Sequence, residues 1–184
     1  SGKTTLLNMI GGLDKLTSGE VIINNVKLNN LNENELIDFR LNNIGFIFQA
    51  YNLIPVLTAI ENVEFIMLLQ GINHLIRKER STELLKYVGL ENKINSRPNQ
   101  LSGGQQQRVA VARALASNPS FILADEPTAN LDSKSTNKLL DLMAKMNKEQ
   151  NITFLFSTHD QRVINRAKRI ITIEDGKIIS DEKN

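Results

Sequence analysis

One run of five residues, Phe121 to Asp125, constrains the fold more than any other part of the sequence. It is apolar until its last residue, and such a run is typical of a strand that is buried on both faces of a parallel sheet. Two further apolar runs, at 44–48 and 152–157, are interpreted as strands of the same core. Because helical patterns separate these strands along the chain, the sequence predicts an α/β domain with a parallel sheet.

The other elements are predicted from hydrophobic periodicity and from turn residues. Helices are expected at 3–10, from the capping box Thr58–Glu61 onward, at 78–88, from Ser102 onward and at 133–149. Hairpins are expected at 20–28 around Asn24-Asn25 and at 169–179 around Asp175-Gly176. Residues 50–115 are mostly helical and lack an expected strand, so we interpret them as a helical subdomain within a single domain that spans 1–184.

Composition limits the classes of protein that fit. The chain has 184 residues, 41% hydrophobic and 23% charged, which is enough for one globular domain with a core. The net charge of +2 is too small to indicate nucleic-acid binding. The absence of cysteine excludes a disulfide framework and thiolate zinc sites. No apolar run approaches the roughly 18 residues of a membrane span, so any membrane contact is expected to come through a partner.

The segment Gly2-Lys3-Thr4 matches the end of the phosphate-binding pattern G-x-x-x-x-G-K-[ST]. In this pattern the glycine lets backbone N–H groups surround phosphate oxygens, and the lysine neutralises the β- and γ-phosphates. Thr4 would be a ligand of Mg²⁺, and the helix that follows would point the positive end of its dipole at the anion. Taken alone, a solvated chain end explains these residues equally well.

The segment Ser102-Gly103-Gly104-Gln105 is a second candidate phosphate site. Ser102 and Gln105 fit an ordinary capping box. A cap does not explain the two glycines in the first turn, since each costs about 1 kcal/mol in helix propensity relative to alanine. Their lack of side chains would leave the free N–H groups open to an incoming phosphate.

Polar residues follow each strand of the predicted sheet. Asp125 and Glu126 end one strand, and Gln49 and His159 follow the other two. Ligands bind at the carboxyl ends of strands in open α/β sheets. Asp125 is therefore a candidate Mg²⁺ ligand, and Glu126 a candidate general base that orients and polarises an attacking water. Gln49 would sense Mg²⁺ and the γ-phosphate, and His159 would hydrogen-bond the γ-phosphate or the water, although each is also explained as an ordinary loop residue.

Taken in order along the chain, these segments resemble the motifs of an ATP-binding cassette (ABC) transporter nucleotide-binding subunit. Ser1-Gly2-Lys3-Thr4-Thr5 resembles the end of Walker A, and Gln49 the Q-loop glutamine. Leu101–Gln105 is similar to the signature motif, Phe121–Glu126 to Walker B and Ala129–Asp132 to the D-loop, with His159 as the switch histidine. The resemblance implies the α/β fold of a P-loop NTPase, the ABC ATPase core, with a parallel sheet, a helical subdomain insertion and an antiparallel hairpin region.

The resemblance also implies an ATPase that works as a homodimer with ATP and Mg²⁺. Two copies would bind two ATP molecules head to tail. The phosphates would be held by one copy, through Ser1, Gly2, Lys3, Thr4 and Thr5. The other copy would close over the γ-phosphate with Ser102, Gly103, Gly104 and Gln105. The metal would be bound by Thr4, Gln49 and Asp125. Asp132 of the D-loop would contribute to nucleotide binding. Hydrolysis would depend on Glu126, His159 and Gln49.

A transmembrane permease subunit is the expected partner, and no nucleic-acid partner is expected. The subunit would lie peripherally on the cytoplasmic face of the cell membrane and contact it only through the permease. Four segments resemble the sequences of one group within the family. The group includes lipoprotein-release, macrolide-export and antimicrobial-peptide-resistance transporters and a related cell-division ATPase. The segments are 46–55, 105–110, 123–132 and 157–160.

Several alternatives stay open at this point. A regulatory scaffold of the cell-division type is one of them. DNA-repair and chromosome ATPases fit poorly, because they place a long coiled coil between motifs that here lie 99 positions apart, at Lys3 and Ser102. The family also has strands, an adenine-stacking aromatic residue and the first Walker A glycine before this point. The chain is therefore expected to be an N-terminally truncated form of an active subunit, which would bind ATP weakly or be inactive as given.

Overall fold

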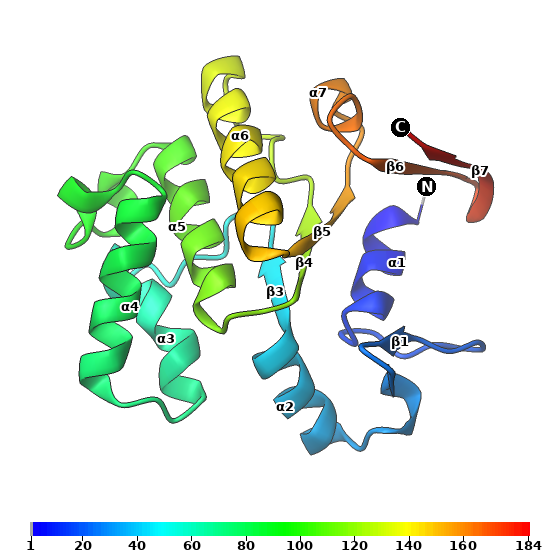
Figure 1. Cartoon of the computed structure of the whole chain (residues 1–184), viewed down its shortest axis with the longest axis horizontal. Helices are drawn as coiled ribbons and strands as arrows, with labels where there is room; N and C mark the ends of the chain where they lie inside the picture. Colours follow the sequence, from blue (N-terminus) through cyan, green and yellow to red (C-terminus); the bar gives the residue numbers. More distant parts are fainter. Residues whose placement is uncertain (1) are drawn as a thin grey trace.

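A computed structural model describes residues 2–184, and Figure 1 shows how its elements are arranged. In chain order the elements are α1 (Lys3–Ile10), β1 (Ile22–Ile23), β2 (Val26–Lys27), η1 (Leu28–Asn30), α2 (Glu33–Asn43), β3 (Ile44–Ile47), α3 (Ala59–Leu69), α4 (His74–Tyr87), η2 (Glu91–Lys93), η3 (Pro98–Gln100), α5 (Gly103–Ala116), β4 (Phe121–Asp125), α6 (Ser133–Gln150), β5 (Thr153–Ser157), α7 (Gln161–Ile164), β6 (Arg169–Glu174) and β7 (Lys177–Lys183).

Three parallel strands in the order β3-β4-β5 form the centre of the molecule. Strand β4 pairs with both neighbours, so that Leu123 lies opposite Phe46 on one side and opposite Leu155 on the other. Ile122, Leu123 and Ala124 are fully buried. The predicted α/β fold, with a central strand buried on both faces, is confirmed.

Helices α3, α4 and α5 pack together on one side of this sheet, and α1 lies on the other side (Figure 1). Val63 and Met67 of α3, Leu85 of α4 and Val109 of α5 are buried in one cluster with Ile122 of β4. No strand lies between residues 50 and 115, as the sequence predicts. The division of the chain into a core and a helical subdomain stays a prediction.

Both predicted hairpins form, and their turns explain their positions. Asn24 and Asn25 have positive φ angles of 51° and 64°, and Asp175 and Gly176 have φ angles of 47° and 73°. Two consecutive residues with positive φ match the twist of the flanking strands, which is why asparagine, aspartate and glycine occur there. Strand β7 continues to Lys183, further than the sequence indicates, and pairs there with Arg169.

Two of the longer helices differ from the sequence predictions, and the short helix α7 was not predicted. Helix α2 was not expected, and none of its residues is fully buried, although Phe39 is partly buried against the cluster of Leu7, Ile44 and Leu123. It is defined at its start by a capping box, in which the Asn32 side chain accepts from the Glu35 N–H and the Glu35 carboxylate accepts from the Asn32 N–H. Helix α4 begins at His74, four residues before the expected start, because the Asn73 side chain accepts from the Leu75 N–H.

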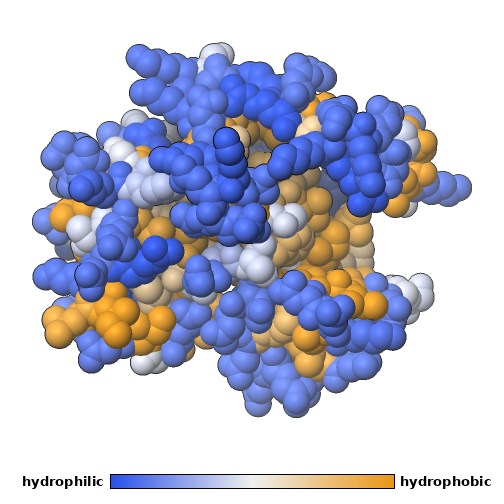
Figure 2. All heavy atoms as spheres, in the orientation of Figure 1, coloured by the Kyte–Doolittle hydropathy of each residue, from blue (hydrophilic) through white to orange (hydrophobic). Residues whose placement is uncertain are grey.

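The surface is mostly polar, with a few apolar patches. Leu68, Leu69, Leu75 and Ile76 are more than half exposed around the turn between α3 and α4, and Figure 2 shows apolar surface over that turn at the lower left. Within residues 2–184, none of the helices combines the length and the apolarity that crossing a bilayer requires.

Candidate active site

The first turn of α1 presents Lys3 and Thr4 beside the carboxyl ends of the central strands. Gly2 precedes the helix with a φ of 77°, a left-handed conformation that glycine adopts at little cost. Within the described part of the chain no side chain caps this helix, and the N–H groups of such a helix start can bind an anion. Ser1, which the sequence assigns to the same loop, lies outside the described residues.

Thr4 and Asp125 meet across the gap between α1 and β4. The Thr4 hydroxyl donates to the Asp125 carboxylate, with both oxygens 3.1 Å away. A hydroxyl beside a carboxylate, next to a candidate phosphate-binding helix turn, fits Mg²⁺, which is usually held by one or two protein oxygens and by substrate phosphates. Residues 2–184 contain no cluster of three or more acidic, histidine or cysteine side chains that could form a metal site.

Glu126 follows β4 and is held from several directions. Its N–H donates to the Ser157 carbonyl at 2.8 Å, its Oε2 accepts from the Thr158 hydroxyl at 3.2 Å, and its Oε1 lies 2.7 Å from His159 Nδ1. The Glu126 side chain is only 15% exposed, whereas that of His159 is 79% exposed. A shielded carboxylate beside an imidazole that faces solvent can accept a proton from water.

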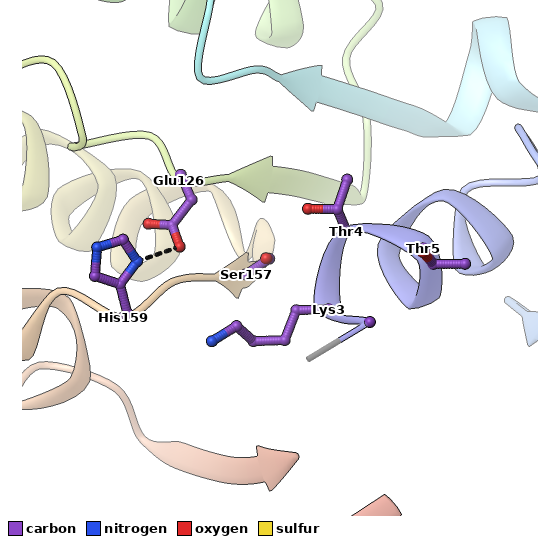
Figure 3. A pocket seen from close by; sticks show the side chains of 7 residues that line it. Lys3, Thr4, Thr5, Glu126, Ser157 and His159 are labelled. Atoms are coloured by element: carbon purple, nitrogen blue, oxygen red, sulfur yellow. Dashed lines mark hydrogen bonds and ion pairs between the residues drawn. The ribbon is translucent and has the colours of Figure 1, made fainter. Parts of the chain in front are cut away.

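A cavity of about 310 Å³ lies between α1 and this pair (Figure 3). It is lined by Gly2, Lys3, Thr4, Thr5, Glu126, Ser157 and His159. Figure 3 shows Lys3 extending from α1 toward Glu126 and His159. The structure thus brings together a candidate phosphate-binding helix turn, a lysine side chain and a candidate base.

Gln49 does not line the cavity. It follows β3, and its carbonyl accepts from the Asn130 amide at 3.1 Å. This bond joins the segment after β3 to the segment after β4. The metal-sensing and catalytic roles predicted for Gln49 stay predictions.

The first turn of α5 forms a capping box, as the sequence predicts. Ser102 Oγ accepts from the Gln105 N–H at 3.3 Å, and Gln105 Oε1 accepts from the Ser102 N–H at 2.8 Å. An added Cβ would lie 2.9 Å from the Tyr51 hydroxyl at Gly103 and 2.9 Å from Ser135 Oγ at Gly104. The two glycines therefore also have a reason within the chain, because other elements approach the helix closely at both positions.

None of Ser102, Gly103, Gly104 and Gln105 lines the cavity beside Lys3. The residues of the α5 turn and the residues of the cavity are therefore two separate groups within one chain.

Asp132, the last candidate, caps α6 by accepting from the Ser135 N–H at 2.9 Å and from the Ser135 hydroxyl at 2.6 Å. These bonds lower the pKa of Asp132 below its ordinary value.

Two residues at this edge of the sheet were not predicted as functional. Thr158 donates to Glu126, and Asp160 accepts from the Thr128 hydroxyl at 2.8 Å and from the Arg162 guanidinium. The Arg162 side chain in particular holds the pKa of Asp160 well below its usual range. Their sequence signal is their place beside His159 after a buried strand, where polar residues of parallel sheets converge.

Comparison with known proteins places these features in a family. A family model described as "ABC transporter" matches residues 1–129. The ABC transporter ATP-binding protein MJ0796 of Methanocaldococcus jannaschii is 51% identical over all of this chain and 80% of its own length. The lipoprotein-releasing system ATP-binding protein LolD of Legionella pneumophila is 42% identical over 99% of this chain and 80% of its own.

Two further matches add a larger protein and a solved structure. The macrolide export ATP-binding/permease protein MacB of Pasteurella multocida is 45% identical over 98% of this chain, which covers 28% of MacB. A dimeric structure of MJ0796 in a post-hydrolysis state, bound to ADP and Pi, is similar with a TM-score of 0.91 and 50% identity. It matches 99% of this chain and 80% of that chain.

Proposed function

This chain belongs to the ABC transporter family as an ATP-hydrolysing, ATP-binding subunit, and from that premise we propose which of its residues carry out the hydrolysis. The observation that supports the assignment most directly is the Glu126–His159 pair, which faces Lys3 across the cavity. A base, a cation and the free N–H groups of a helix are what phosphoryl transfer to water needs.

In this proposal the phosphates are held by the start of the chain, with Ser1, Gly2, Lys3, Thr4 and Thr5. Lys3 neutralises charge on the β- and γ-phosphates, and the α1 N-terminus adds its dipole. Thr4 and Asp125 would hold Mg²⁺, because their oxygens are already adjacent. When bound, the metal would neutralise charge on the phosphate oxygens.

Glu126 acts as the general base and His159 keeps it in place. The Glu126 carboxylate accepts a proton from the attacking water, while Thr158 and His159 fix its orientation through the bonds described above. His159 is exposed enough to contact the γ-phosphate as well. Gln49 approaches the same edge of the sheet and would contact the metal or the water.

A second copy of the chain completes each ATP site in this proposal. Ser102, Gly103, Gly104 and Gln105 lie apart from their own cavity, so they are available to the nucleotide of the partner copy. The similar MJ0796 cassette has been solved as a dimer bound to ADP and Pi. A head-to-tail pair would place each α5 N-terminus at the opposite cavity, with Asp132 and its neighbours near the contact.

A transmembrane permease is the proposed membrane partner. A groove of about 300 Å³ lies beside the segment after β3, and it is lined mainly by apolar side chains, among them Phe46, Phe48, Ile54, Phe65 and Ile66. The Arg113 guanidinium donates to the carbonyls of Tyr51 and Asn52, which ties this segment to α5. Movement of α5 on ATP binding would therefore reach the groove.

The place of the subunit in the cell and its transport task follow from that partner. The subunit would lie peripherally on the cytoplasmic face of the membrane. The relatives LolD and MacB carry names for lipoprotein release and macrolide export, and we place the task of this chain in the same range.

The substitution Glu126→Gln tests this proposal in the full-length subunit. It removes the base but keeps the size and hydrogen-bonding reach of the side chain. We expect ATP hydrolysis to fall by at least about 100-fold, while ATP still drives dimer formation on gel filtration. The matched control is Glu174→Gln at the exposed end of β6, which should hydrolyse ATP normally. Undiminished hydrolysis by Glu126→Gln would exclude Glu126 as the base.

A further inference from the structure

The side chain of Gln107 on α5 is fully buried and only half satisfied. Its amide Nε2 donates to the Pro127 carbonyl at 2.7 Å, and its Oε1 has no hydrogen-bond partner among residues 2–184. An unsatisfied buried polar atom costs about 1–3 kcal/mol, so an apolar residue of the same size would suit packing alone. The single bond to Pro127 is what distinguishes glutamine at this position.

Pro127 directly follows Glu126, the proposed base, in a strained part of the backbone. Glu126 has a φ of 44°, which a residue with a Cβ adopts rarely. Its N–H is fixed to the Ser157 carbonyl, and the proline ring locks the φ angle of the next residue. A displacement of the Pro127 carbonyl can be absorbed at Pro127 only through its ψ angle, so the remainder passes to Glu126.

The first turn of α5 rests on the same segment that follows Glu126. An added Cβ at Gly103 would lie 3.6 Å from the Asn130 carbonyl, and one at Gly104 would lie 4.0 Å from Leu131 and 2.9 Å from Ser135. Gln107 lies about one helical turn further along α5 than Gly103. Because a helix moves as a unit, a displacement of its N-terminus also displaces Gln107, and through the hydrogen bond it displaces Pro127.

We propose that Gln107 is a positioning residue that couples the two ATP sites of the dimer. When the nucleotide of the partner copy binds at the α5 N-terminus, Gln107 shifts. This shift moves the Pro127 carbonyl and thereby aligns Glu126 of the same chain as Gln107. The proposal rests on the proposed function, in which each α5 N-terminus completes the partner's site. Each active site would thereby respond to the occupancy of the other.

The test compares Gln107→Leu with Gln106→Leu in the full-length subunit. Both variants replace a glutamine of α5 with an apolar residue, but the Gln106 amide donates to the Leu101 carbonyl and does not contact Pro127. The rate of hydrolysis is measured against ATP concentration. ATP-driven dimer formation is measured in the Glu126→Gln background.

For Gln107→Leu we expect maximal turnover to fall about tenfold, because a small misplacement of the catalytic base slows the chemical step. The dependence on ATP concentration should lose its sigmoidal shape, while dimer formation persists. Gln106→Leu should keep both the rate and the shape of the curve. If Gln107→Leu does not fold, Gln107→Met replaces it, since methionine adapts to an irregular core position.

A Gln107 variant with the turnover and sigmoidal curve of the parent would overturn the coupling role, as would equal losses in both α5 variants. A parent curve without any sigmoidal shape would overturn it too. Failure of the proposed function has a different signature, because Glu126→Gln would then keep hydrolysing ATP whatever the Gln107 variants do.

Discussion

At the scale of single residues, Glu126 has a strained backbone conformation that hydrogen bonds from its neighbours hold in place. A residue with a Cβ in the left-handed region costs about 1–3 kcal/mol and persists only where its surroundings hold it. Here the Ser157 carbonyl holds its N–H, and Thr158 and His159 hold its carboxylate. The strain places the carboxylate at the cavity, whereas a relaxed extended residue would have continued β4 in its own direction.

Asp160 stabilises the loop that carries His159, and its charge makes this contribution depend on pH. The Arg162 guanidinium and the Thr128 hydroxyl lower the pKa of Asp160 in the folded protein below the roughly 3.9 of an unfolded aspartate. The folded state therefore gains stability from the ionised carboxylate above pH 4. This gain is lost as the pH falls toward the folded-state pKa.

The substitution Asp160→Asn should lower the free energy of unfolding at pH 7 by about 1.5–3 kcal/mol, the usual loss for hydrogen bonds to a charged group. Between pH 6 and pH 3 the melting temperature of this variant should decline less than that of the parent. Thermal melts at several pH values measure both effects. Asp38→Asn, at an exposed position on α2, is the control and should follow the parent. Parallel pH curves for Asp160→Asn and the parent would contradict the assignment.

Residue by residue, the sequence predicts the parts of the site that stand at strand ends. Asp125, Glu126 and His159 were identifiable there, since parallel strands bring their carboxyl ends to one edge. Gln107 and Thr158 could not be assigned a role in this way. Their significance depends on contacts with Pro127 and Glu126, and a buried donor on a helix looks like any other helical glutamine until the fold is known.

At the scale of elements, the packing of α5 against β3 depends on Gly45. An added Cβ would lie 2.6 Å from the Ala114 carbonyl of α5 and 2.9 Å from Ile122. The nearest atom belongs to a helix backbone, which cannot move aside as a flexible side chain would. The distance between α5 and the sheet is therefore limited by this glycine.

The substitution Gly45→Ala should lower the free energy of unfolding by about 1–3 kcal/mol, as other overpacked core positions do. Because α5 must shift, ATP hydrolysis should fall as well. Urea unfolding measures the loss as a lower midpoint with an unchanged slope. A midpoint equal to that of the parent would show that α5 and β3 are packed less tightly than the structure indicates.

Elements differ in how well the sequence predicts them, and the reason is where their stabilisation comes from. Strand β4 is apolar because both faces are buried, so its pattern is visible in five residues. Helix α2 fully buries none of its residues and is defined by the Asn32–Glu35 capping box. Helix α4 begins at a cap on Asn73. Elements that depend on local hydrogen bonds therefore escape a search for hydrophobic periodicity.

At the scale of the whole molecule, each chain carries two halves of different sites in the proposed mechanism. The cavity is lined by Gly2, Lys3, Thr4 and Thr5 of one segment and by Glu126, Ser157 and His159 of two others. The N-terminal turn of α5 at 102–105 is absent from this lining. Two inactive variants with different damaged halves should therefore restore one complete site when they form a mixed dimer.

The pair Lys3→Ala and Ser102→Glu tests this arrangement. Lys3→Ala damages the phosphate loop, and Ser102→Glu places a carboxylate where the partner's γ-phosphate would arrive. Each variant alone should hydrolyse ATP poorly. In the mixed dimer, the intact phosphate loop of one chain meets the intact α5 turn of the other, so activity should return. About half of the parent activity is the upper limit, from one of two symmetric sites, and the proposed coupling through Gln107 lowers it because the other site is damaged. Purification through two different affinity tags isolates the mixed dimer for the assay. If Ser102 served the ATP of its own chain, both sites of this dimer would be damaged and no activity would return.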